Sequence, residues 1–349
     1  MNTTIFEIDK DNIDTKIIRE AAALLKKGGL VAFPTETVYG LGGNAFSSET
    51  VEKIFLAKGR PGDNPLIVHI HSMGQLEILA ENIPKEAILL AEKFWPGPLT
   101  MIFKAKKSIP PIVTGGLDTV GIRMPSDLVA LELLKTADIP VAAPSANISG
   151  RPSPTRGEHV IEDLSGKIDG IIVSSQSVLG IESTVLDLTV TPALILRPGS
   201  VSLEEIKRHI PAEYDSSLIS EKPRSPGTKY RHYAPKCDLY IVKGSLEEKA
   251  KKIKNIILSA AKENEGLQTG ILITKEMYDK LEFPDQGNVK IRISGSVKFP
   301  DKITADFYKN LREFDGENTK VIYMEDISEE ITGRAYQNRS EKASGGKYI

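Results

Sequence analysis

The stretch DTKIIREAAALLKKGGLVAFPTETVYGLGG at residues 14–43 decides how the N-terminal part of this chain folds. Residues 14–27 place apolar side chains on one face of a helix, and Gly28-Gly29 ends that helix, as glycine commonly does. Residues 30–33 are all apolar and predict a short buried strand, which Pro34 stops. Residues 34–43 then follow a strand directly, which is where open α/β sheets bind ligands.

The same alternation continues on the C-terminal side of this stretch. Further helices are predicted over 50–57, 85–94 and 128–136, and strands over 66–70, 99–103, 120–124, 141–143, 171–173, 184–188 and 194–196. We therefore expect an α/β fold with a twisted sheet of mixed strand direction rather than a doubly wound one.

Residues 210–236 contain several prolines and show little periodicity, which predicts a linker. After it, strands and helices alternate again. The sequence thus predicts a catalytic domain over 1–209, a basic Pro-rich linker over 210–236 and a second, smaller Rossmann-like α/β domain over 237–349.

Composition limits the possible functions. The net charge of −2 argues against a general polyanion binder, and Cys237 is the only cysteine, so neither a disulfide nor a cysteine zinc site can form within the chain. No apolar run approaches the length of a membrane span, and the N-terminus is polar and acidic. These features favour a cytoplasmic protein.

Two segments carry hydroxyls or cations after predicted elements. PTETVYGLGG at 34–43 matches neither G-x-G-x-x-G nor a P-loop, and could bind a small polar ligand or simply be a turn. KGRPGDNPLIVH at 58–69 sets Lys58 and Arg60 on a rigid turn that suits a phosphate or carboxylate, although a solvated basic loop is the alternative.

Other polar residues lie within or directly after strands. Arg123 interrupts an apolar strand and shares a face with Gly121 and Pro125, so it needs an anionic partner from the protein or a substrate. Small and hydroxyl residues at 142–153 could hold phosphate, but the segment lacks G-x-S-x-G and a triad, which excludes a serine hydrolase.

The linker itself is strongly basic. Residues 222–236 contain lysines, arginines and two tyrosines but no acid. Such a segment could clamp a nucleotide by charge and stacking, or be a plain solvated linker.

Taken in order, PTETVYGLG, KGRPGDNPLIVHI, GIRMPSD, APSANISGRPSPT and GIESTVLDL closely resemble the YrdC-like threonylcarbamoyl-AMP synthase family. The resemblance covers about residues 28–199, and HYAP at 232–235 is similar to the long form with a C-terminal domain. It implies that ATP, bicarbonate and L-threonine yield threonylcarbamoyl-adenylate and pyrophosphate, with Mg²⁺ carried by ATP and no protein metal site. A Kae/TsaD-type partner would pass the threonylcarbamoyl group to adenosine 37 of tRNA.

The resemblance also implies roles for individual residues. The residues expected to bind L-threonine are Thr37, His69, Arg123, Ala143 and Ser183. Those expected to bind ATP are Lys58, Arg60, Asn64, Thr119, Ser145, Ser153, Arg197 and Tyr233, with Lys58 and Arg60 as the catalytic cations. The basic segment would close over the site as a lid with Tyr233 near the nucleotide.

Two other functions are compatible with parts of the sequence. A hydrogenase-maturation carbamoyltransferase also forms a carbamoyl-adenylate, but its cysteine-rich zinc fingers cannot exist here. A double-stranded RNA-binding or ribosome-associated module would bind RNA in a salt-dependent way without ATP turnover, and weak RNA contact is compatible with either reading.

Overall fold

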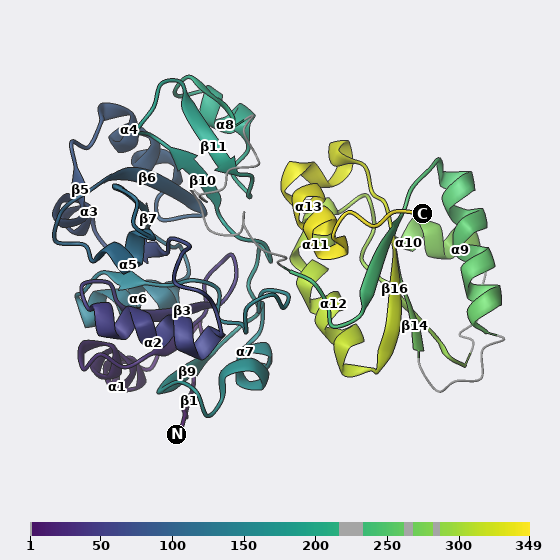
Figure 1. The fold of residues 1–349 in the computed structure, drawn as a ribbon, viewed down its shortest axis with the longest axis horizontal. Coiled ribbons are helices and arrows are strands. Elements are labelled where there is room, and N and C mark those ends of the chain that lie inside the picture. Colours follow the sequence, from purple (N-terminus) through teal and green to yellow (C-terminus); the bar gives the residue numbers. More distant parts are fainter. Residues whose placement is uncertain (1, 216–232, 262–267, 282–286) are drawn as a thin grey trace. The chain divides into compact units, whose positions relative to one another are not determined.

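The structure is a computed structural model that describes residues 2–215, 233–261, 268–281 and 287–349. The chain divides into two compact units, residues 1–149 with 153–230 and residues 150–152 with 231–349 (Figure 1).

The first unit is built on one large mixed sheet. Its strand order is β1-β9-β2-β3-β8-β4-β7-β6-β10-β11-β12, with β5 paired to β6. Neighbours run parallel in β4/β7 and antiparallel in β6/β7, so the predicted mixed direction is confirmed. The strands are β1 (Thr4–Glu7), β2 (Val31–Phe33), β3 (Gly40–Asn44), β4 (Ile67–His69), β5 (Ala80–Glu81), β6 (Leu99–Ala105), β7 (Thr119–Arg123), β8 (Val141–Ala142), β9 (Gly170–Val173), β10 (Thr184–Asp187), β11 (Ala193–Arg197) and β12 (Ala212–Tyr214).

Several helices of this unit begin at a side-chain cap. Asp14 accepts a hydrogen bond from the backbone of Lys16 at 2.8 Å, and Asp127 accepts one from Ala130 at 3.0 Å. Such caps satisfy backbone N–H groups that have no partner within the helix. The helices are α1 (Thr15–Lys26), α2 (Ser48–Lys58), α3 (Met73–Leu79), α4 (Lys85–Phe94), α5 (Pro111–Thr114), α6 (Leu128–Ala137), α7 (Gly157–Leu164) and α8 (Leu203–Lys207).

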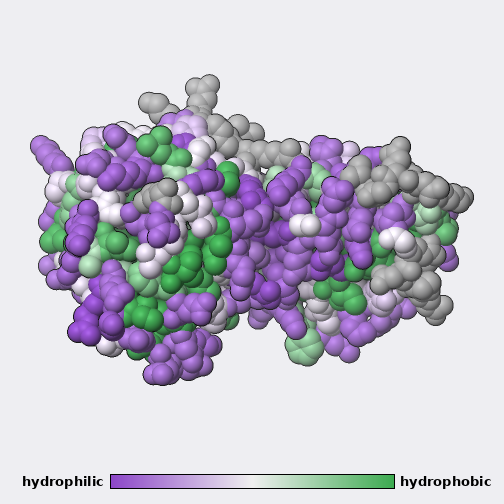
Figure 2. Space-filling view, turned by 90° about the horizontal axis from the view of Figure 1, so that it is seen from below, coloured by the Kyte–Doolittle hydropathy of each residue, from purple (hydrophilic) through white to green (hydrophobic). Residues whose placement is uncertain are grey.

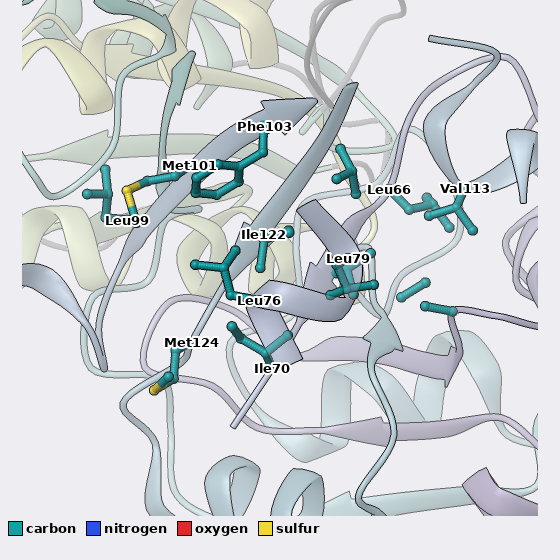
Figure 3. Packing of buried hydrophobic residues seen from close by; sticks show 14 of the residues in the cluster. Leu66, Ile70, Leu76, Leu79, Leu99, Met101, Phe103, Val113, Ile122 and Met124 are labelled. Atoms are coloured by element: carbon teal, nitrogen blue, oxygen red, sulfur yellow. The ribbon is translucent and has the colours of Figure 1, made fainter. Parts of the chain in front are cut away.

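Side chains along β6 and β7 point alternately into the core and toward the opposite face of the sheet. Leu99, Met101 and Phe103 of β6 pack with Ile122 of β7 in one buried cluster that includes residues of α3 (Figure 3). Because successive strand residues point to opposite faces, Thr100 of β6 and Arg123 of β7 project away from this core. The core therefore fixes the strands that carry Arg123.

The chain between the two predicted domains starts differently from the expected linker. Residues 212–214 form β12, which pairs in parallel with β11. Pro211 does not prevent this, because its carbonyl still accepts a hydrogen bond from Ala193 and an edge strand tolerates the missing donor. The part of the predicted linker at 216–232, with most of the basic residues, lies outside the described residues.

The second unit contains a smaller, fully parallel sheet of order β13-β16-β14-β15, as an α/β domain requires. Its helices cover both faces of the sheet, α9 and α10 on one side and α11, α12 and α13 on the other (Figure 1). The elements are β13 (Asp238–Val242), α9 (Leu246–Ala260), β14 (Gln268–Ile273), α10 (Lys275–Leu281), β15 (Val289–Ile293), α11 (Pro300–Ala305), α12 (Phe307–Gly316), β16 (Thr319–Glu325) and α13 (Glu329–Ser344).

The surface carries both polar and apolar residues. Figure 2 shows hydrophilic side chains interspersed with smaller hydrophobic patches on the face in view. None of the described helices is long and apolar enough to cross a membrane.

Candidate functional site

Arg123 is the centre of the candidate site. It ends β7 and is only 3% exposed. Its Nε donates to the Gly97 carbonyl at 3.1 Å, and its Nη1 donates to Thr37 Oγ1 at 2.9 Å. A guanidinium has five N–H groups, so these two bonds leave three for other acceptors.

Glu36 lies beside the remaining N–H groups of Arg123. Its Oε1 is 2.6 Å from Nη2, an ion pair between two buried side chains. The atoms are close but poorly aligned. Within the described residues, neither Glu36 oxygen nor Arg123 Nη2 makes a hydrogen bond. Polar atoms buried in this way are uncommon and point to a missing partner such as a ligand.

The segment after β2 is held in one conformation by hydrogen bonds. Thr35 Oγ1 donates to the Val38 carbonyl at 2.6 Å, so the contact of 2.8 Å between the two threonine hydroxyls has Thr37 as donor. The Glu36 carbonyl accepts from Leu179 at 2.8 Å, and Tyr39 N–H donates to Pro154 at 2.8 Å. The two side chains that contact Arg123 thus come from a fixed loop.

Ser183 joins the site through β6. Its Oγ is 2.8 Å from Thr100 Oγ1, on the β6 face away from the core. Arg197 donates to the Ser183 carbonyl at 3.1 and 3.0 Å and to Oγ at 3.1 Å, so Arg197 anchors Ser183. Gly199 lets the chain after β11 pass close to the backbone of Ser183 and Thr184, because a Cβ at residue 199 would lie 2.1 Å from the Thr184 nitrogen.

Lys58, predicted to face phosphates, has bonds to the protein. Its Nζ donates to the carbonyls of Ser145 and Asn147 at 2.6 and 2.7 Å, and it is 2% exposed. Gly59 ends α2 in the left-handed conformation at φ 59°, which turns the chain between the two cations. Lys58 therefore holds the 145–147 loop in place.

Arg60 and Asn64 lie on the turn that follows. Arg60 Nη2 donates to the Asn64 carbonyl at 3.3 Å, and the guanidinium is 5.8 Å from the Phe55 ring centroid. The Asn64 side chain is fully buried, yet neither amide atom has a hydrogen-bond partner among the described residues. This amide is a second buried polar group available to a ligand.

His69 lies next to Arg123 in the sheet, since the two are register partners of β4 and β7. Burial, and then the positive charge of Arg123, lower the pKa of His69 to about 3. The ring is therefore neutral at physiological pH, and its Nδ1 makes no hydrogen bond within the described residues. Ala143 follows β8, where its N–H donates to Ile67 of β4 at 2.9 Å.

The remaining predicted residues are more scattered. Ser145 Oγ donates to Asn147 Oδ1 and Ser153 Oγ to Glu182 Oε1, each at 2.6 Å. Thr119 begins β7. Tyr233 belongs to the second unit, where its ring centroid is 5.4 Å from that of Tyr308. Its place in a nucleotide site stays a prediction.

The structure thus brings Thr37, Arg123 and His69 together and links Ser183 to the same face through β6. Sequence reasoning missed Glu36 and Thr100. Glu36 stood between two hydroxyl residues of a segment already singled out, and Thr100 interrupts an apolar strand at the alternate position. Both signals were present in the sequence.

The fold and these side chains define a two-unit α/β protein with a buried polar site suited to a small carboxylate ligand. Residues 23–199 match the profile of the Sua5, YciO and YrdC family, described as Telomere recombination, and residues 201–345 match that of the threonylcarbamoyl-AMP synthase C-terminal domain. A threonylcarbamoyl-AMP synthase of Pyrococcus abyssi is 45% identical over 97% of each chain. The chain belongs to the threonylcarbamoyl-AMP synthase family.

Other comparisons agree. A threonylcarbamoyl-AMP synthase of Bacillus subtilis is 43% identical over 95% of this chain and 94% of its own. The crystal structure of P. abyssi Sua5 with L-threonine superposes with a TM-score of 0.89, at 42% identity and 99% coverage of both chains. E. coli YciO, at 24% identity and a TM-score of 0.53, covers 58% of this chain and 99% of its own and shares the fold of the first unit.

Proposed function

We propose that this chain makes L-threonylcarbamoyl-adenylate from L-threonine, bicarbonate and ATP, with release of pyrophosphate. The amine nitrogen of threonine bonds to the bicarbonate carbon and water leaves, which gives a carbamate. A carbamate oxygen then attacks the α-phosphorus of ATP, and pyrophosphate departs. The names of the full-length relatives and the threonine-bound P. abyssi structure support this reaction.

The observation that carries the proposal is the set of buried polar atoms around Arg123 that make no hydrogen bond within the described residues. They belong to Glu36, His69 and Arg123 itself. Burying a polar group without a partner costs free energy, which a ligand of matching chemistry recovers. A small amino acid with a carboxylate, an ammonium group and a hydroxyl has that chemistry.

On the threonine side, the free N–H groups of Arg123 pair with the carboxylate. Thr37, His69, Ser183 and the backbone at Ala143 surround the rest of the amino acid. Because His69 is neutral, it adds no repulsion to Arg123 and can hydrogen-bond a hydroxyl.

On the nucleotide side, the Asn64 amide and Arg60 contact ATP, with Arg60 beside the phosphates. Lys58 acts mainly by fixing the loop that carries Ser145, since its ammonium already donates to two carbonyls of that loop. Thr119, Ser153 and Arg197 complete this side of the site.

Catalysis rests on placing the reactants together, because the reaction needs no nucleophilic side chain. Holding two reactants in an aligned geometry contributes roughly 7–11 kcal/mol. The described residues contain no group of three or more His, Cys, Asp or Glu side chains that could hold a metal ion. In this proposal Mg²⁺ enters with the ATP substrate, bound through phosphate oxygens.

The product is a mixed anhydride that hydrolyses easily, so it needs an acceptor enzyme close by. A Kae/TsaD-type transferase that modifies adenosine 37 of tRNA would take this role, and its tRNA substrate puts the reaction in the cytoplasm.

The test is pyrophosphate release from ATP and bicarbonate, with and without L-threonine, and with L-serine in its place. We expect release to require threonine and to be at least about tenfold slower with serine, which lacks one methyl group. Release that is equal without any amino acid would overturn the proposal.

A further inference from the structure

Glu36 is a buried carboxylate that its own protein leaves without hydrogen bonds. It is 8% exposed, and within the described residues its oxygens contact a charged partner only at Arg123, through the ion pair of 2.6 Å. Its backbone is fixed by the bond from Leu179. A purely structural buried carboxylate normally accepts several hydrogen bonds.

The charges around Glu36 match those of a zwitterion. Arg123 offers N–H groups to a carboxylate, and Glu36 beside it offers oxygens to a cation. An α-amino acid carries a carboxylate and an ammonium group on one carbon. The two protein charges are therefore adjacent in the way the two ligand charges are.

No other cation competes for Glu36 in the described surroundings. His69, next to Arg123, is neutral, and the charge of Glu36 acts on the Asp127 carboxyl at the start of α6, which also interacts with Lys10. The pKa of Asp127 is raised, mainly by burial and further by Glu36. The Tyr39 hydroxyl donates to backbone carbonyls and, with its pKa raised by burial, stays neutral.

From this geometry we infer that Glu36 binds the ammonium group of the substrate amino acid and accepts its proton before carbamate formation, an inference that rests on the proposed function. One proton moves from nitrogen to a Glu36 oxygen and leaves a neutral amine. The nitrogen lone pair forms the bond to the bicarbonate carbon. The hydroxyl of bicarbonate leaves as water with the second nitrogen proton, and Glu36 returns its proton to solvent after product leaves.

The test compares Glu36→Gln with the wild type in threonine-dependent pyrophosphate release between pH 7 and pH 9.5. At pH 7 kcat/KM for threonine should fall by about 100-fold, within the range of general-base catalysis. Toward pH 9.5 free threonine arrives with a neutral amine, so the defect should shrink to about tenfold or less, leaving the binding loss. Glu36→Asp keeps the carboxylate on a side chain that is one methylene shorter. At pH 7 it should show a smaller defect than Glu36→Gln.

Two controls separate this inference from structural damage and from the proposed function. Glu325→Gln removes a buried carboxylate of the second unit and should leave the pH profile unchanged, and melting curves should show that each variant folds. A defect in Glu36→Gln that is constant with pH, or the absence of a defect, overturns the inference while the wild-type activity stands. A wild type without threonine-dependent release overturns the proposed function instead.

Discussion

Glu36 of the first unit and Glu325 of the second are both buried glutamates paired with a cation, at 8% and 4% exposure. Both oxygens of Glu325 accept hydrogen bonds from the protein. Its Oε2 accepts from the N–H and the hydroxyl of Thr274 at 2.9 and 2.8 Å, and its Oε1 accepts from Lys249 at 3.1 Å. Glu36 makes one misaligned ion pair and no hydrogen bond within the described residues.

The difference distinguishes a structural carboxylate from a functional one. In the second unit the carboxylate stabilises the end of β16 and the start of α10 by accepting hydrogen bonds at both oxygens. In the first unit, polar atoms on the face of β4 and β7 opposite the core are buried but incompletely paired. Burial alone does not mark a site. Buried polar atoms without a hydrogen-bond partner occur in both units, but those of Glu36, His69 and Arg123 gather around one buried ion pair, and this clustering marks the site.

The largest effect on activity should come from substituting Arg123 in the first unit. Arg123→Lys keeps the charge but loses the planar set of N–H groups. We expect kcat/KM for threonine to fall by about 100-fold or more, because a buried charge pair loses its geometry. Arg292 pairs with Glu313 and Glu317 in the second unit. Arg292→Lys is therefore the matched control and should keep full turnover. Similar losses of kcat/KM in both variants would contradict the assignment of the site to the first unit.

The next effect is on stability and concerns Glu325, the structural carboxylate of the second unit. Glu325→Gln should lower the free energy of unfolding of the second unit by about 3 kcal/mol, because Lys249 loses its buried partner. Urea unfolding curves measure this loss, and threonine turnover below the melting temperature should not change. Lost turnover with unchanged stability would assign Glu325 to a site instead.

A smaller effect is expected from pH at His69. Its pKa of about 3 in the folded chain is below the ordinary value of 6.5, so only the unfolded chain takes up this proton between those values. Stability from His69 is therefore complete above pH 6.5 and is lost progressively as the pH falls below that value.

Melting temperatures of the wild type and His69→Gln at pH 7, 6 and 5 measure this contribution. The wild type should lose more stability toward pH 5 than the variant. Equal losses would mean that His69 titrates normally and is not enclosed beside Arg123.

Much of this arrangement could be predicted from the sequence, because it depends on local patterns. The apolar alternation of β6 and β7 assigns Arg123 to the face away from the core, and PTETVYGLGG follows a strand as expected. The acceptors of Lys58 could not be predicted. They are backbone carbonyls about ninety residues away, brought close by tertiary folding. The position of β16 between β13 and β14 depends on long-range pairing in the same way.

Amide hydrogen exchange with and without L-threonine tests the central claim most directly. Threonine should slow exchange at residues 35–39, 97–100, 121–124 and 180–184, around the incompletely paired groups, and leave the strands of the second unit unchanged. Slower exchange in β14 and β16, with no change around Arg123, would contradict the account.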